Sequence, residues 1–298
     1  MRRGRTLTIV GSLIAGMALL VVLAGKRHQL LASLHSASLW VLAGAALLQI
    51  VALVARSEAW HRTIAAAGGT IDRRVLFRAS SMQVLGGVVN SQLGVAARIA
   101  ALRRSAPGGC PQVATLVAAE LPILIVEAAL AALASFTLIG PLGLPWWAPA
   151  LAIGLVGGVG IGLRRLAIRK GRELWEGLAV LRTPGRGGVV VAFVLVAVLA
   201  QIARNWMLLH AVGVDASVLE AIAVLIAVVT LGQLPVGLGP GIGAASAVLI
   251  LGHGGVAATA AAGVLMTATG TVGGLCFAGW AGGDRLLCRS GLLRRRFA

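Results

Sequence analysis

Long apolar segments constrain this chain more than any other feature of its sequence. They cover about residues 7–24, 39–59, 113–139, 147–163, 189–209 and 256–281. Each is close to or longer than the length that an α-helix needs to cross a bilayer, which is about 17–25 residues. We therefore expect an all-α, polytopic transmembrane bundle, with residues 1–298 forming a single transmembrane domain.

The charge content supports this class and excludes others. Apolar residues make up 58% of the 298 residues and charged residues only 12%, which is too little charge for a soluble domain of this size. Lys and Arg outnumber Asp and Glu by 26 to 9, for a formal charge of +17. The chain is too apolar for a nucleic-acid partner, so the basic residues are interpreted as short cytoplasmic loops or, secondarily, as contacts to anionic lipid headgroups.

The positions of Lys and Arg also orient the segments. Basic residues at 56–78 and 164–186 predict cytoplasmic loops, and the uncharged residues 140–147 predict an external one. Residues 284–298 read as a basic cytoplasmic tail. The apolar run at 7–24 resembles a signal peptide, but no convincing cleavage site follows it, which favours an uncleaved span. Both termini are therefore expected in the cytoplasm.

The second half of the chain repeats features of the first. Arg56 and Trp60 have counterparts in Arg204 and Trp206, about 146 to 148 positions later. The match predicts two repeats, at about residues 7–140 and 147–283, although two stretches rich in Gly, Ala and Val also align by chance. Because the Lys/Arg pattern gives the halves opposite orientations, the repeat is expected to be inverted, as in many transporters.

Each half also contains an interrupted segment. Residues 75–102 include polar side chains and have basic residues at both ends, which places both ends on one side of the membrane and predicts a re-entrant hairpin. Residues 218–251 are interrupted at 235–243 and predict a second hairpin. Complete crossing by either hairpin would raise the number of spans without changing the side of the termini. Broken helices of this kind place substrate sites near the bilayer midplane.

Two carboxylates lie at membrane depth, where charges are costly and usually functional. Glu120 and Glu127 are seven residues apart, so they share one helix face, and Pro122 is expected to loosen that helix. They are interpreted as proton-coupled or headgroup-binding groups. The alternatives are a structural ion pair or, for Glu120, a position near the cytoplasmic interface.

Two arginines also lie within predominantly apolar segments. Arg98 falls in the first hairpin and Arg204 in the fifth span, beside Asn205. Either guanidinium could hold a lipid phosphate through a bidentate contact, or could neutralise a glutamate. Arg56, with Glu58 nearby, could do the same, but snorkelling to the interface is the preferred interpretation for it.

The second interruption is rich in glycine. Its backbone N–H groups could face an anionic headgroup, with a plain tight turn as the alternative. A nucleotide loop is excluded because no Lys-Ser/Thr follows. No catalytic residue, metal site or cofactor is expected, since the three cysteines are dispersed. The expected substrate-binding residues are Glu120, Glu127, Arg98, Arg204, Asn205, Asn90, Gln92, Gly239, Gly241 and Gly243.

Four motifs resemble the lysylphosphatidylglycerol synthase transmembrane region, a flippase-like integral membrane family. They are Arg56-x-x-x-Trp60, the polar break before Arg98, Ala119-Glu120, and the Leu-Pro-Val-Gly-Leu-Gly-Pro-Gly-Ile-Gly run at 234–243. The resemblance covers about residues 7–283. It implies a multi-pass protein of the bacterial inner membrane that moves lipids between leaflets. The chain contains no aminoacyl-transferase domain, so it is expected not to be an enzyme.

Three positions depart from the family pattern. Val95 and Ser246 stand where the family usually has Glu, and Leu121 stands where it commonly has Arg. The expected partner is a phospholipid or polyprenyl-linked lipid. The alternative is a non-transporting scaffold with an envelope-biosynthesis partner protein. A polyprenyl-phosphate transferase is disfavoured because the aspartates are scattered. The sequence leaves the oligomeric state open.

Overall fold

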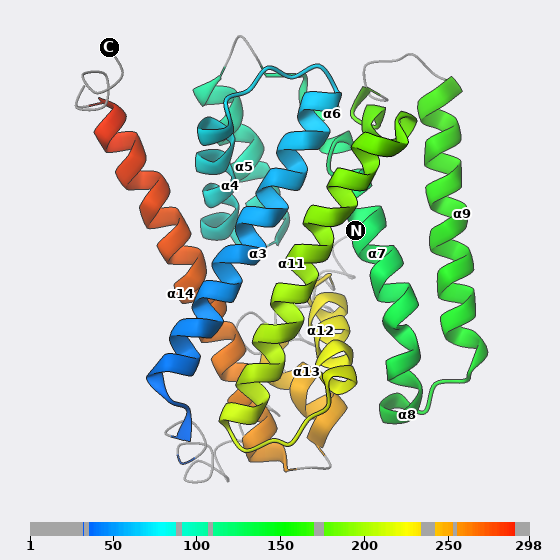
Figure 1. The fold of residues 1–298 in the computed structure, drawn as a ribbon, viewed down its shortest axis with the longest axis vertical. Helices are drawn as coiled ribbons and strands as arrows, with labels where there is room; N and C mark the ends of the chain where they lie inside the picture. The colour runs from blue at the N-terminus through cyan, green and yellow to red at the C-terminus, as the bar shows by residue number, and fades with distance from the viewer. Residues whose placement is uncertain are drawn as a thin grey trace, which may run out of the picture. The chain divides into compact units, whose positions relative to one another are not determined.

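The computed structural model describes residues 32, 36–87, 91–106, 110–169, 176–233, 242–252 and 255–289. Within these ranges all regular structure is helical, which confirms the all-α class (Figure 1). The chain divides into two compact units. Unit 1 comprises Met1–Gln49, Ala131–Ile153 and Leu199–Val272, and unit 2 comprises Ile50–Leu130, Gly154–Val198 and Gly273–Ala298.

Five stretches in the described ranges are long and apolar enough to cross a membrane. They are Leu39–Ala66, Val113–Leu142, Trp147–Ile168, Gly185–Ala211 and Val256–Leu286. They coincide with five of the six expected spans, and the expected span at 7–24 lies outside the described residues. The helices that form them are α3 (Leu39–Ala66), α6 (Val113–Ala118), α7 (Leu121–Ala134), η1 (Ser135–Leu138), α8 (Ile139–Leu142), α9 (Trp147–Arg169), α11 (Pro184–Ala211) and α14 (Val256–Arg289).

The surface of these helices suits lipid. Leu151 and Leu155 of α9 are 63% and 70% exposed, and Trp146 just before it is 76% exposed. A soluble protein rarely leaves such extended apolar surface in water. Trp near a segment end is typical of the membrane interface. The polytopic membrane class is therefore supported by side-chain exposure as well as by helix length.

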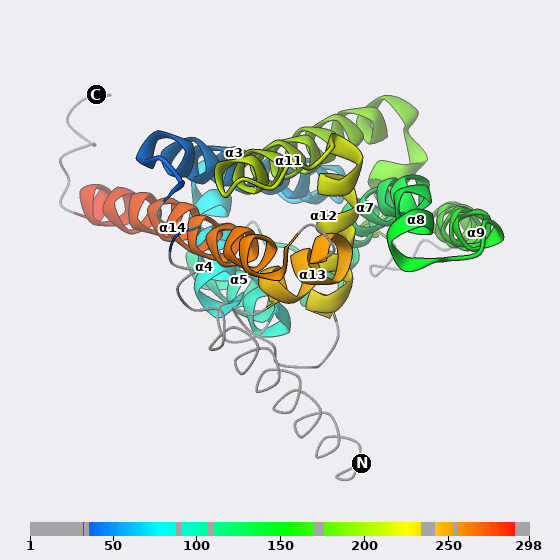
Figure 2. The ribbon, with the colours of Figure 1, turned by 90° about the horizontal axis from the view of Figure 1, so that it is seen from below.

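Unit 2 contains the first interrupted segment as two packed helices, α4 (Arg73–Gly87) and α5 (Ser91–Ser105), which lie side by side in both views (Figures 1 and 2). The α14 helix packs closely on α4, because a Cβ at Gly274 would overlap the side chain of Val84. A short 3₁₀ helix, η2 (Ala179–Arg182), also belongs to this unit. The apolar core of unit 2 includes Trp60, Leu76, Leu102 and Ile123.

Unit 1 contains the second interrupted segment as α12 (Val218–Gln233) and α13 (Ile242–Leu251), which also pack together. A capping box starts α12: the Ser217 hydroxyl accepts from the Glu220 N–H at 3.2 Å, and the Glu220 carboxylate accepts from the Ser217 N–H at 2.8 Å. The apolar core of unit 1 includes Leu208, Leu209, Val224 and Ile250. Whether either helix pair is re-entrant, and whether the halves are inverted repeats, remain predictions.

Candidate functional site

A break between α6 and α7 positions Glu120. The first helix ends at Ala118 and the second begins at Leu121. Pro122 lacks the N–H that would donate to the carbonyl four residues earlier, so the helix loosens here as expected. The Glu120 carbonyl still accepts from the N–H groups of Ile123 and Leu124, both at 3.1 Å. The carboxylate therefore projects from a local interruption inside a membrane-spanning segment.

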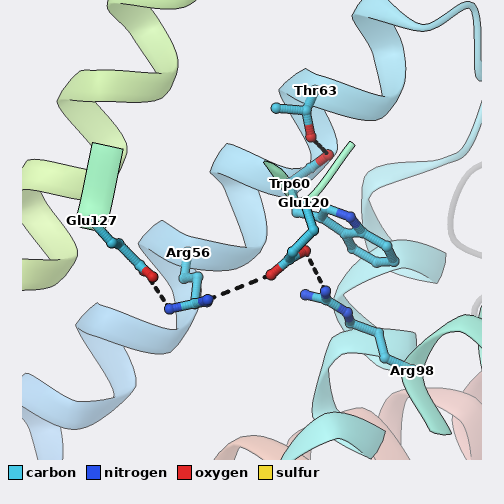
Figure 3. A network of polar contacts seen from close by, with 6 residues as sticks. All are labelled: Arg56, Trp60, Thr63, Arg98, Glu120 and Glu127. Atoms are coloured by element: carbon cyan, nitrogen blue, oxygen red, sulfur yellow. Dashed lines mark hydrogen bonds and ion pairs between the residues drawn. The ribbon is translucent and has the colours of Figure 1, made fainter. Parts of the chain in front are cut away.

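Four charged side chains of unit 2 alternate in sign and form what we call the charge network (Figure 3). Arg98 donates to one carboxylate oxygen of Glu120, and Arg56 donates to the other at 3.4 Å. Arg56 also donates to Glu127. The order Glu127–Arg56–Glu120–Arg98 gives two cations and two anions, so the network is neutral. Arg98 and Glu120 are only 1% and 7% exposed, whereas Arg56 and Glu127 are partly exposed.

Trp60 forms one wall of the charge network. The Cζ atom of Arg98 lies 3.8 Å from the centroid of the fully buried indole, which is a cation–π contact. Three buried N–H groups around it have no acceptor among the described residues: Nε of Arg56, Nε of Arg98 and Nε1 of Trp60. Buried donors without acceptors are costly. These N–H groups are therefore available to donate hydrogen bonds to water or to the oxygen atoms of a ligand.

The expectation that Arg56 snorkels to the interface is wrong. Its guanidinium bridges Glu120 and Glu127, which are spaced two helical turns apart on α6–α7. A buried guanidinium without a carboxylate partner would be an uncompensated charge, which is costly. The nearby Glu58 has other partners, since it pairs with Arg62 at 3.0 Å and Arg73 at 2.7 Å.

Arg204 of unit 1 is in a different electrostatic situation. It donates to the amide oxygen of Gln49 and, at 3.4 and 3.2 Å, to that of Asn205. Both acceptors are neutral. The sequence has nine acidic residues, and all except Glu173 are described. None of the described ones lies within ion-pair distance of Arg204, which is only 8% exposed.

Gly270 of α14 lies beside Arg204. A Cβ at this glycine would be 3.4 Å from a terminal nitrogen of Arg204, which is about an ordinary contact distance. The Nδ2 group of Asn205 is buried without an acceptor among the described residues. A buried cation held by amides alone, with a spare donor beside it, is suited to binding an anion.

The other expected site residues are distributed as follows. The structure places Glu120, Glu127 and Arg98 together in unit 2, and Arg204 with Asn205 in unit 1. Gln92 lies at the second position of α5. Gly243 lies in α13, where a side chain would overlap the backbone of Gly263. Its position is thus one of close helix packing. The remaining three, Asn90, Gly239 and Gly241, lie outside the described residues.

Sequence reasoning missed three participants. Arg56 and Trp60 were recognised as a repeated pair and a family motif but not as expected substrate-binding residues, and Gln49 was not singled out. The sequence feature that could have identified them is a polar or aromatic side chain within, or at the end of, an otherwise apolar span. Among the described residues, no group of three or more His, Cys, Asp or Glu side chains could hold a metal ion.

The fold and the buried charges define a polytopic helical membrane protein with ionisable side chains between its spans. The model of the lysylphosphatidylglycerol synthase transmembrane region matches residues 8–275. The chain therefore belongs to this family, as its motifs indicated. Comparisons with curated proteins and with solved structures gave no match.

Proposed function

We propose that this protein binds a phospholipid or lipid-linked substrate and moves it between the leaflets of the bacterial inner membrane, with both termini in the cytoplasm. The observation that carries the proposal is the charge network at the break between α6 and α7. Membership of a family linked to lipid handling supports it. A structural ion network alone would not require a broken helix or three buried donors without acceptors.

The network suits the exchange of ionic partners. A lipid headgroup entering the hydrocarbon region loses its hydration, and fixed charges of both signs can replace it. A phosphate can take the place of the Glu120 carboxylate on Arg98 or Arg56, while the freed carboxylate accepts a proton or a cationic headgroup. Because the network is neutral, such an exchange leaves no isolated charge when the headgroup departs. Arg204 provides a second anion-binding group in unit 1.

The second candidate is a non-transporting scaffold for an envelope-biosynthesis partner. Its support is the loss of charges usual in the family at Val95, Leu121 and Ser246. Ser246 is fully buried and its hydroxyl has no partner among the described residues, so that position is ill suited to ion exchange. An enzymatic role on polyprenyl phosphate has less support, because Asp72, Asp215 and Asp284 are far apart in the sequence.

The test is lipid flipping in proteoliposomes, with fluorescent anionic, cationic and zwitterionic phospholipids and chemical quenching of the outer leaflet. Glu120→Gln is the test variant. Glu220→Gln is the matched control, because it makes the same chemical change in the exposed capping box, which also accepts glutamine. We expect the test variant to slow flipping about tenfold or more, equivalent to roughly 1.4 kcal/mol in the barrier. The control should match the wild type.

Size-exclusion chromatography of every variant distinguishes a folding defect from a transport defect, because a misfolded variant would not elute as a single monodisperse peak. Arg204→Gln, with the same readout, asks whether unit 1 contributes. Wild-type protein that is monodisperse but flips no tested lipid would overturn the proposal. Co-purification of a stoichiometric partner in that case would favour the scaffold.

A further inference from the structure

A cleft in unit 2 contains none of the charge-network residues. It lies among α4, α5 and α14 and has a volume of about 440 Å³. Its polar lining is Arg78, Arg285, Ser81 and Ser105, and the rest of the lining is small or apolar. We call it the arginine cleft. Its volume falls within the range of about 300–1,000 Å³ that is usual for ligand pockets.

Arg78 is held in place by contacts that use only one of its three guanidinium nitrogens. Its Nε group forms an ion pair with Asp284 at 3.3 Å and donates to the Arg74 carbonyl at 3.4 Å. Its two terminal nitrogens have no partner among the described residues. Asp284 neutralises one of the two cleft arginines, so the site keeps a net positive charge. A guanidinium fixed through Nε presents its terminal N–H groups as a fork for phosphate.

The surroundings extend the positive charge. Arg285 is exposed and has no ion-pair partner among the described residues. The α4 helix begins at Arg73 and Arg74, and Arg103 and Arg104 occupy the last turn of α5. All four are exposed. Basic pockets between transmembrane helices bind anionic lipid headgroups, and clustered arginines at helix ends are typical of such sites.

The apolar part of the lining distinguishes lipid from a soluble anion. Ala79, Ala101, Ala278 and Ala281 contribute small side chains, and Met82 is exposed beside them. Phosphate alone would gain nothing from this surface. A glycerophospholipid would place its phosphate on the arginines and its glycerol and first methylenes against the alanines.

We propose that the arginine cleft holds the phosphate of a resident anionic phospholipid, with the acyl chains extending into the bilayer. The site is independent of the proposed function, because lipid can be retained in detergent without any transport. Phosphatidylglycerol fits better than phosphatidylcholine, whose choline group would bring a second positive charge to a cationic cleft.

The test is native mass spectrometry of the full chain in detergent, titrated with phosphatidylglycerol or phosphatidylcholine. Wild type is expected to retain one phosphatidylglycerol in preference to phosphatidylcholine. Arg78→Gln/Arg285→Gln is expected to weaken that binding about tenfold or more. The matched control is Arg164→Gln/Arg165→Gln, which removes the same charge from exposed positions of α9 and should bind as the wild type does. Arg285→Gln alone keeps the Arg78–Asp284 pair intact and should weaken binding by an intermediate factor.

Three outcomes would overturn the proposal. The first is equal phosphatidylglycerol binding by wild type and by a monodisperse Arg78→Gln/Arg285→Gln variant. The second is displacement of the lipid by millimolar inorganic phosphate, which would identify a small-anion site. The third is an equal loss of binding in the α9 control, which would show that overall charge, and not a defined site, determines binding.

Discussion

Glu120 is shared by two arginines, so its replacement by glutamine has a calculable consequence. The variant leaves Arg56 and Arg98 with one carboxylate, that of Glu127, which contacts only Arg56. Arg98, 1% exposed, becomes a buried cation without an acidic partner among the described residues. Removing one member of a buried ion pair costs about 3–5 kcal/mol. We expect a loss of unfolding free energy in this range for Glu120→Gln.

The double variant Arg98→Gln/Glu120→Gln should be more stable than Glu120→Gln. It removes one charge of each sign and leaves Arg56 paired with Glu127. The two replaced side chains are in direct contact, so their effects should not add. Coupling between contacting residues is about 0.5–3 kcal/mol, and the burial of this pair places our expectation near the upper end.

The assay is SDS titration in mixed micelles, with helix content followed by circular dichroism for wild type, both single variants and the double variant. Glu220→Gln, at the half-buried first turn of α12, serves as control and should change stability by no more than about 0.5 kcal/mol. The reasoning is refuted by additive losses, in which the double variant is less stable than Glu120→Gln by the full effect of Arg98→Gln.

Three further predictions concern packing, reactivity and topology. Gly263→Ala should reduce thermal stability, measured by heating in detergent, because the added Cβ would overlap the backbone of Gly243. Gly158→Ala is the control and should leave thermal stability unchanged, because its Cβ would meet nothing within 4 Å. Burial raises the pKa of the Cys110 thiol, so less thiolate is present at pH 7.5 than in a free cysteine. Alkylation of Cys110 should therefore be slower in the folded protein than in SDS-unfolded protein. This difference in rate should shrink as the pH rises past the raised pKa. In a cysteine-free background, Trp146→Cys should react with an impermeant maleimide only from outside and Arg186→Cys only from the cytoplasm, and the reverse would invert the topology.

The membrane spans could be predicted because bilayer thickness sets their length. Their ends could not, since polar residues continue the helix where tertiary partners exist. The second span was expected to end near residue 59, but α3 continues to Ala66, and Glu58 pairs there with Arg62 and Arg73. The chain turns only after that, at Gly68, with a φ of +85°. The expected cytoplasmic tail similarly begins within α14, which ends at Arg289.

The individual site residues were recognisable because charge at membrane depth is expensive, which singled out Glu120, Glu127 and Arg98. An arginine–glutamate pair was one of the predicted alternatives, but which residues pair was not recognisable, because it depends on how α3, α5 and α6–α7 pack. Arg56 shows the difference: its sequence position suggested an interfacial side chain, and its packing gives it two carboxylates. Trp60, which covers Arg98, carried no electrostatic signal of its own.

Arg204 offers the sharpest separation between a structural and a transporting role. Gln49 accepts a hydrogen bond from its guanidinium, and Gln49→Glu would place a nearly isosteric carboxylate there. A carboxylate would compensate the buried charge, so the variant should be at least as stable as wild type on heating in detergent. The same carboxylate would compete with a lipid phosphate, so flipping in proteoliposomes should fall if Arg204 binds substrate. Gln112→Glu, which makes the same chemical change at an exposed position just before α6, is the control. Higher stability with unchanged flipping would show that Arg204 only holds the helices together, and would remove unit 1 from the proposed substrate path.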